Sequence, residues 1–260
     1  MTVKPTLLIA KSVLIEAVRR REVYAVVLVS TLLIGLVMTV RFFGLEGLSK
    51  FYREIALKVM GIATALTVVV LASRQLPREF ETRTIYPLLA KPISRTGFLL
   101  GKLLGVLLGA GFCFALFMAV FLAGTWVLGG RVPWVLFLQH VYLQMLMLLV
   151  LATLCFWLSM ILHLDAAITI GVLLFLLAAT FTTVTSTLYD FASPFGRALI
   201  VGLTYVIPQL ALFDLSEKAV HGEAWEPLRL PVMAALTAYA AVYTVIHFSL
   251  ALLSFRRRSL

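Results

Sequence analysis

The stretch Arg74–Lys102, RQLPREFETRTIYPLLAKPISRTGFLLGK, decides how the rest of the chain must be arranged. It carries Lys or Arg at positions 74, 78, 83, 91, 95 and 102, with two carboxylates, Glu79 and Glu81, between them. Each Arg or Lys at a bilayer centre costs roughly 2.5–3.5 kcal/mol. Even if the two outermost cations reach the interface, the other four would cost about 10 kcal/mol. The stretch, broken by three prolines, is therefore predicted to be a short amphipathic docking element outside the hydrocarbon, between two membrane helices.

The composition of the chain is that of a polytopic membrane protein. Of its 260 residues, 62% are hydrophobic and only 13% are charged, which is far from the balance of a soluble domain. The formal charge of +10 is explained by basic cytoplasmic loops, so no nucleic-acid partner is predicted. Cys113 and Cys155 lie in apolar runs and imply no disulfide framework. No cleavable signal peptide is expected, because no small-residue cleavage site follows the first apolar run near Val23.

Hydropathy predicts an all-α fold with six transmembrane helices in one domain, residues 1–260. The expected spans are 23–40, 55–73, 98–128, 134–162, 166–188 and 230–255. A mixed segment between the first two spans is expected to form a short interfacial helix. Residues 189–230, interrupted by three prolines, are predicted to be an amphipathic segment on the outer side.

Residues 1–22 are predicted to form an amphipathic helix ahead of the first span. On a helical wheel its apolar face consists of Leu7, Ala10, Val13, Leu14, Ala17 and Val18, and its polar face of Ser12, Glu16, Arg19 and Arg20. A basic amphipathic helix of this kind lies in the membrane interface. Two interpretations stay open, an elbow helix beside the first span and a simple anchoring leader.

The distribution of Lys and Arg predicts the orientation. Six spans place both termini on one side, together with residues 74–102 and 163–165. That side holds 14 Lys/Arg against 5 Asp/Glu, whereas the opposite side holds 8 against 7. Because Lys and Arg mark the cytoplasmic side, both termini are expected in the cytoplasm.

Gly97, Gly101, Gly105 and Gly109 recur every four residues along the third predicted span. Small residues at this spacing let a neighbouring helix approach closely. The neighbour is expected to come from the same chain, and a subunit interface is the alternative. The run Gly97–Lys102 is no phosphate loop, because only three residues separate its glycines.

No catalytic, metal or cofactor site is predicted. The middles of the expected spans contain no Asp, Glu, Lys or Arg, which argues against a self-powered carrier or an ion channel. His140 and His247 lie within spans, where a histidine can form a helix-to-helix hydrogen bond or take a proton or metal role. The sequence has no HExxH or GxSxG motif.

A run of hydroxyl side chains lies near the outer end of the fifth predicted span, including Thr180, Thr182, Thr183 and Thr185. Such hydroxyls can bond to carbonyls within their own helix. The alternative is a polar lining for a substrate route near the outer leaflet.

The sequence resembles the ABC-2-type permeases, membrane subunits of bacterial ABC exporters with the type V exporter fold, and especially their NosY-like branch. The resemblance rests on REFETRTIYPLLAKPISRTGFLLGKLLG (78–105), on YVIPQLALFDL (205–215) and on the six-span plan. It covers nearly the whole chain.

The resemblance implies a coupling helix in the cytoplasmic loop 74–97, within residues 78–90, that docks on a separate ATPase. The implied docking residues are Arg78, Glu79, Phe80, Glu81, Thr82, Arg83, Thr84, Tyr86, Leu88 and Leu89. The turn into the third span would consist of Lys91, Pro92, Ser94 and Arg95, and the second contact of His163 and Asp165. Many members have a glycine where this chain has Arg83, which leaves the helix boundary open.

The resemblance also implies partners. Two permease subunits would pair, as a homodimer or with a sister permease, in the lipid of a bacterial inner membrane. Two ATPase subunits would bind ATP and Mg²⁺, so that this chain itself needs no cofactor. The alternative is a mechanotransmitter that passes ATPase motion to a periplasmic protein or lipoprotein without moving a substrate.

Overall fold

The computed structural model describes residues 3–19, 21–37, 45–81, 94–222 and 224–257. These residues form helices and connecting loops, without a strand among them. The α-helices are α1 (Val3–Arg19), α2 (Arg21–Val37), α3 (Leu45–Glu81), α5 (Arg95–Val127), α6 (Trp134–Ile161), α7 (Leu164–Tyr189), α8 (Pro194–Val206), α9 (Ser216–Val220) and α10 (Leu230–Arg257), and a 3-10 helix, η1, covers Leu210–Phe213.

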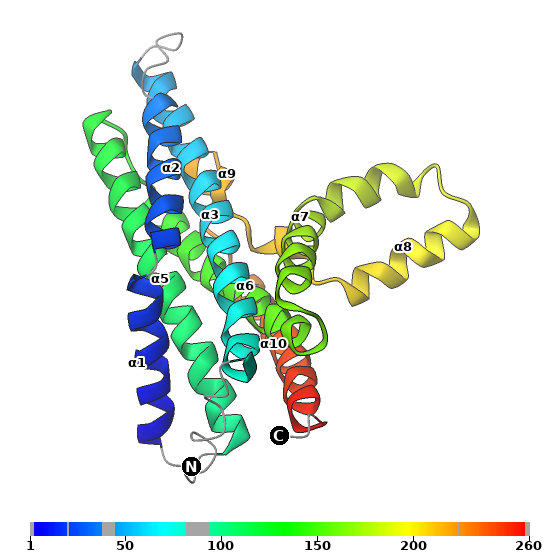
Figure 1. The fold of residues 1–260 in the computed structure, drawn as a ribbon. Coiled ribbons are helices and arrows are strands. Elements are labelled where there is room, and N and C mark those ends of the chain that lie inside the picture. The colour runs from blue at the N-terminus through cyan, green and yellow to red at the C-terminus, as the bar shows by residue number, and fades with distance from the viewer. Residues whose placement is uncertain (1–2, 20, 38–44, 82–93, 223, 258–260) are drawn as a thin grey trace.

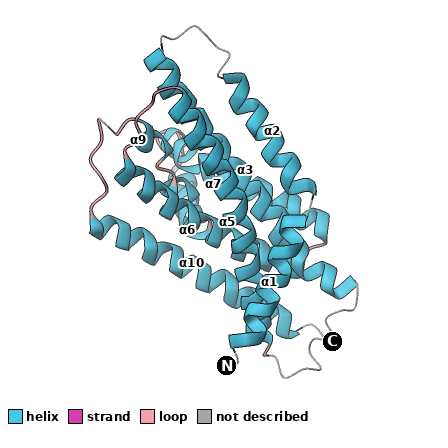
Figure 2. Cartoon of the chain, turned by 90° about the vertical axis from the view of Figure 1, so that its left-hand side faces the viewer, coloured by secondary structure: helices cyan, strands magenta, loops and turns pink. Residues whose placement is uncertain are grey.

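Helix α6 is the centre of the bundle. It packs against α3, α5, α7 and α10, and Figures 1 and 2 show these helices running alongside one another. Leu143, Leu151 and Phe156 of α6 are fully buried. A sequence that is apolar on most sides is expected of a helix in this position.

Four helices are long and apolar enough to cross a membrane, within 47–80, 95–127, 134–161 and 230–257. Helix α8 and the segment 210–220, bent by 50°, would count as a fifth span if taken together. Helices α2 and α7, at the first and fifth predicted spans, contribute shorter apolar stretches, 24–36 and 164–178. By the length and composition of the described residues, the six-span prediction is not confirmed.

Helix α3 corrects the prediction that proline breaks the stretch after the second span. It has 37 residues, a length of about 55 Å, and it continues through Pro77 to Glu81. Pro77 lacks the N–H that would bond to the carbonyl of Ser73. Burial of Gln75 and Leu76 beside it holds the last turns in place. Since a bilayer core is only about 30 Å thick, the helix is long enough to extend well beyond it.

Helix α1 lies along α5. A Cβ at Gly101 would meet the Thr6 carbonyl oxygen at 2.8 Å, and one at Gly109 would meet the Ala17 Cβ at 2.9 Å. The residue numbers of the two helices rise together, so α1 is parallel to α5 for about three turns. An elbow helix that lies in the membrane interface would cross the end of the bundle, whereas α1 runs along α5. The predicted placement is therefore not confirmed.

The second half of α7, together with the whole of α8, forms an arm that extends away from the bundle (Figure 1). Asp190–Ser193 connect the two helices, and Ser193 caps α8 by accepting a hydrogen bond from the Gly196 N–H. The chain returns to the bundle at Gln209, whose N–H donates to Tyr239 of α10 at 2.9 Å. We call residues 180–206 the arm.

Candidate functional site

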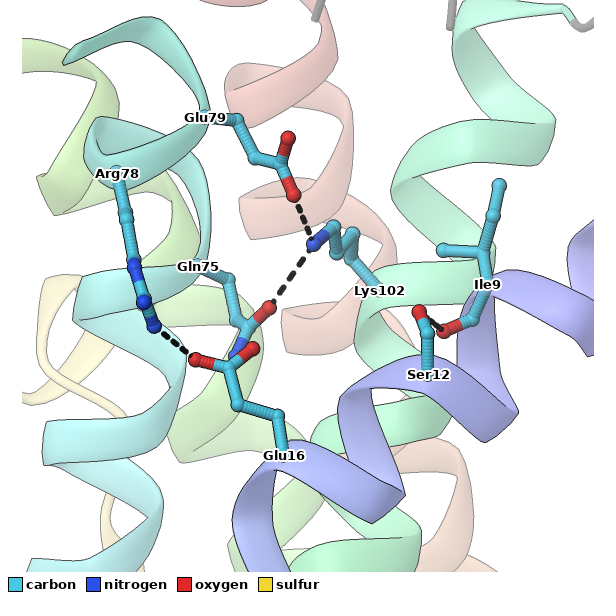
Figure 3. A network of polar contacts seen from close by, with 7 residues as sticks. All are labelled: Ile9, Ser12, Glu16, Gln75, Arg78, Glu79 and Lys102. Atoms are coloured by element: carbon cyan, nitrogen blue, oxygen red, sulfur yellow. Dashed lines mark hydrogen bonds and ion pairs between the residues drawn. The ribbon is translucent and has the colours of Figure 1, made fainter. Parts of the chain in front are cut away.

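The ends of the connection between α3 and α5 are tied together by a buried ion pair. The Lys102 ammonium donates to Glu79 Oε1 at 2.5 Å and to Gln75 Oε1 at 3.2 Å (Figure 3). The Lys102 side chain is 6% exposed and that of Glu79 17%. Removing one of the two charged groups would leave the other with little water around it, which is unfavourable. The ion pair therefore stabilises the packing of α3 against α5.

Phe255 of α10 joins the same place. Its ring stacks on Phe98 of α5, with centroids 6.0 Å apart, and lies 6.0 Å from the ring of Phe80 of α3. Arg95 lies over the Phe255 ring and donates to the carbonyl oxygens of Phe255 and Arg256. These carbonyls belong to the last turn of α10, where they lack helical partners and attract a cation.

Helix α1 is attached to the same end through Glu16, which pairs with Arg78 of α3 (Figure 3). Four helices, α1, α3, α5 and α10, therefore meet where both chain termini lie (Figure 1). We call this set the terminal cluster, which consists of Glu16, Gln75, Arg78, Glu79, Phe80, Arg95, Phe98, Lys102 and Phe255.

The predicted docking residues fall partly on this cluster. Arg78, Glu79 and Phe80 occupy the last turn of α3, and Glu81 ends the helix. The others, Thr82, Arg83, Thr84, Tyr86, Leu88 and Leu89, lie outside the described residues, as do Lys91 and Pro92 of the predicted turn. The ATPase-docking role of the stretch stays a prediction.

Ser94 and Arg95, from the predicted turn into the third span, begin α5. The Ser94 hydroxyl accepts a hydrogen bond from the Gly97 N–H at 3.1 Å, a helix N-cap. Arg95 reaches back to α10 from the first position of the helix. The helix start is thereby fixed both to its own backbone and to the bundle.

The predicted second contact lies at the turn between α6 and α7. His163 is the N-cap of α7 and Asp165 lies in its first turn, and both are exposed. A carboxylate at a helix N-terminus is stabilised by the helix dipole. Leu164, between them, lines a cavity that also touches Arg74 and Arg78 of α3, so the turn lies beside the terminal cluster.

The glycine row receives α1. Besides the contacts of Gly101 and Gly109, a Cβ at Gly105 would come within 2.9 Å of the Ala10 carbonyl oxygen, and one at Gly97 within 3.4 Å of the Thr6 hydroxyl. The close neighbour that this spacing predicts is therefore a helix of the same chain. Its identity as the N-terminal amphipathic helix was not part of the prediction.

The hydroxyls of the proposed outer substrate route lie on α7. The Thr180 hydroxyl donates to the Leu176 carbonyl oxygen at 2.9 Å, and Thr185 is half-buried. The side chains of Thr182 and Thr183 are not described. The bond of Thr180 fits a structural role, and the substrate route stays a prediction.

Sequence reasoning missed the link between Lys102 and Glu79 and the part played by Phe255. The Lys102 side chain was expected to reach the membrane interface, but it is buried. The available signal was a lone ammonium inside an otherwise apolar helix, which needs a carboxylate or amide partner nearby. Phe255 carried no signal, because one phenylalanine in an apolar span resembles any other.

The described residues contain no group of three or more His, Cys, Asp or Glu that could hold a metal ion. His140 and His247 are buried in α6 and α10. Both ring nitrogens of His140 and the Nδ1 of His247 lack a hydrogen-bond partner among the described atoms. The His247 ring stacks on Trp157 with centroids 6.3 Å apart, which is a packing contact.

Long apolar helices and one charged, aromatic end where both termini meet define a polytopic membrane protein. A family model for the ABC-2 family transporter protein matches residues 7–260, and the chain belongs to this family. It is thus the permease subunit of an ABC transporter, a membrane component that is not itself catalytic and belongs with an ABC ATPase. No curated protein matches the chain significantly, and its placement in the NosY-like branch is not confirmed.

Proposed function

We propose that this permease couples a separate ATPase to export across a bacterial inner membrane. Both termini and residues 74–97 would lie in the cytoplasm, as the excess of Lys and Arg at that end supports. The ATPase would bind residues 78–90. The observation that carries the proposal is the terminal cluster, because it joins α3 and α5, the helices on either side of residues 82–93, to each other and to α1 and α10.

The cluster suggests how a push on the docking segment reaches the membrane. Residues 82–93 are flanked by Glu79 on one side and Lys102 on the other, and these two form the buried ion pair. A displacement of the segment would therefore move α3 and α5 together. Phe255 would carry the movement to α10 and Glu16 would carry it to α1. ATP and Mg²⁺ would be bound by the partner.

The assembly would contain two permeases, as a homodimer or with a sister permease, and two ATPases. Dependence on a partner ATPase is favoured over a self-powered mechanism, because the middles of the expected spans contain no Asp, Glu, Lys or Arg that could carry protons or ions. The hydroxyls on α7 would line the outer part of the cargo route.

The docking proposal is tested by affinity purification of the tagged chain from its native membranes. Exchanging two charges in the segment, Glu81→Lys with Arg83→Glu, is expected to release the ATPase while the permease stays inserted. The matched control is Glu226→Lys with Arg229→Glu, an exchange between exposed residues at the opposite end, which should leave the ATPase bound. Equal recovery of the ATPase with both variants would contradict the assignment.

The arm favours a second function, the mechanotransmitter. Phe191 is 86% exposed, Phe195 80% and Tyr205 78%, and exposed aromatic side chains are typical anchors of protein interfaces. The arm and residues 207–230 would then bind a periplasmic protein or lipoprotein. Stimulation of ATP hydrolysis by a small molecule or lipid would support export, whereas stimulation only by a periplasmic protein would support transmission.

A further inference from the structure

The turn between α5 and α6 lies at the end of the bundle away from both termini (Figure 1). Both helices are long and apolar enough to cross a membrane. Backbone groups in a turn cannot be satisfied in hydrocarbon, so residues 128–133 lie at the membrane surface, at the depth of the lipid headgroups. This placement is independent of the proposed function, because it holds in either orientation of the chain.

A cavity of about 560 Å³ lies beside this turn. Arg131 is the one charged residue of its described lining, which contains no Asp or Glu, and this arginine is exposed. The cavity therefore presents a single positive charge at headgroup depth.

Two tryptophans share the lining with Arg131. Trp126 lies in the last turn of α5 and is 84% exposed, and Trp134 begins α6 and is 58% exposed. The Trp134 ring lies edge-on to that of Phe137, with centroids 6.0 Å apart. An indole at the membrane surface has an apolar ring that contacts lipid and an N–H group that donates a hydrogen bond to polar atoms. The lining thus combines one cation with two further hydrogen-bond donors.

The backbone of the turn is fixed by the bundle itself. Arg53 of α3 donates a hydrogen bond to the carbonyl oxygen of Arg131, and the Gly130 N–H donates to the Thr125 carbonyl oxygen at 2.9 Å. A Cβ at Gly130 would overlap the Ser49 hydroxyl oxygen, so the turn packs directly on the start of α3. Because the fold already orders this backbone, a ligand that binds here loses little free energy in ordering it.

We propose that this cavity binds the phosphate of a membrane phospholipid, in the leaflet remote from the termini. The Arg131 guanidinium would donate paired hydrogen bonds to the phosphate oxygens, and one phosphate balances its single charge. The indole N–H groups would donate to headgroup or ester oxygens. Leu122 and Val132, the apolar side chains of the lining, would contact the start of an acyl chain. A free anion would use only the polar contacts, so phospholipid is the occupant that the whole lining favours.

Native mass spectrometry of the purified full chain tests the proposal with three added probes. Phosphatidylethanolamine has both the phosphate and the acyl chains, diacylglycerol lacks the phosphate, and glycerol phosphate lacks the chains. Wild type is expected to bind its first phosphatidylethanolamine more tightly than either of the other two probes. Arg131→Gln with Trp126→Leu should weaken that binding at least tenfold, since one charge-assisted hydrogen bond contributes about tenfold.

The matched control is Arg229→Gln with Trp225→Leu, which changes another exposed arginine and another exposed tryptophan. These two residues flank Leu228, whose backbone forms two hydrogen bonds with the side chain of Gln139 near the start of α6. They therefore lie at the same end of the bundle, and they are outside the described lining of the cavity. The control should leave the affinity for phosphatidylethanolamine unchanged.

Three results would overturn the proposal. The first is an equal loss of affinity in the double variant and its control. The second is binding of diacylglycerol as tight as that of phosphatidylethanolamine, which would make the cavity a purely apolar groove. The third is equally tight binding of glycerol phosphate, which would make it a site for free anions. If the double variant does not fold, Arg131→Gln alone must weaken phosphatidylethanolamine binding about tenfold.

Discussion

The terminal cluster and the arm are opposite kinds of structure in one small protein. In the cluster, ions and aromatic rings from four helices are paired at short distance, and Lys102 is buried although it is charged. In the arm, Phe195 and Tyr205 are among the most exposed large hydrophobic side chains of the described residues, and α8 contacts mainly α7.

This difference indicates which part of the permease is packed within the chain and which part is exposed to a binding partner. The residues of the cluster contact one another across four helices of the same chain. This suits an element that transmits force and must stay intact. The arm has apolar side chains that the chain itself does not cover, which suits lipid, cargo or another protein.

The largest expected effect is that of Lys102→Met on stability. It removes the buried ammonium that pairs with the partly buried Glu79 carboxylate, and breaking one side of a buried pair costs about 3–5 kcal/mol. Thermal unfolding of the purified permease should show a large drop. Lys102→Met with Glu79→Met replaces both ions by apolar groups and should recover most of the loss. A double variant as unstable as the single one would contradict the pairing.

Gly105→Leu is expected to have the next largest effect. Its side chain would meet Val13 Cγ1 at 2.8 Å and the Ala10 carbonyl oxygen at 2.9 Å, and overpacking of this kind costs about 1–3 kcal/mol. Gly111→Leu, on the same helix with nothing within 4 Å of its Cβ, is the matched control. Limited proteolysis should show α1 detached only in the first variant. Equal melting temperatures would mean that α1 does not pack on this face.

Phe195→Ser in the arm is expected to have the smallest effect on stability. The side chain is 80% exposed, and substitutions at such positions usually change stability by less than about 0.5 kcal/mol. Its melting temperature should match wild type, whereas any periplasmic partner should bind less tightly in a pull-down. A large loss of stability would show that the arm is covered within the folded subunit.

The hydrophobic pattern of the sequence is sufficient to predict much of the fold. The predicted spans 134–162 and 230–255 agree with α6 and α10 to within a few residues, because long apolar runs allow no other structure in a membrane. The apolar face assigned to residues 1–22 contains Ala10, Val13 and Ala17, which α1 buries together with Ile9, whereas Leu7 of that face is exposed.

The remaining features depend on contacts between distant segments. Pro77 reads locally as a helix break, yet α3 continues because its last turns are held by α5 and α1. The glycine row predicted a close neighbour without identifying it, since many apolar helices could fit. The pairing of Glu79 with Lys102 could not be deduced either, because burial of a charge is decided by the whole bundle.

Two aromatic substitutions test whether the terminal cluster transmits ATPase action. Phe255→Ala removes the ring shared with Phe80 and Phe98, whereas Phe121→Ala removes one stacked on Phe137 at the opposite end, 5.2 Å between centroids. Both should lower stability and keep the ATPase bound. The measurement is ATP hydrolysis by the purified complex compared with the ATPase alone. Only Phe255→Ala is expected to abolish the effect of the permease on hydrolysis, and equal effects of both substitutions would rule out this role of the cluster.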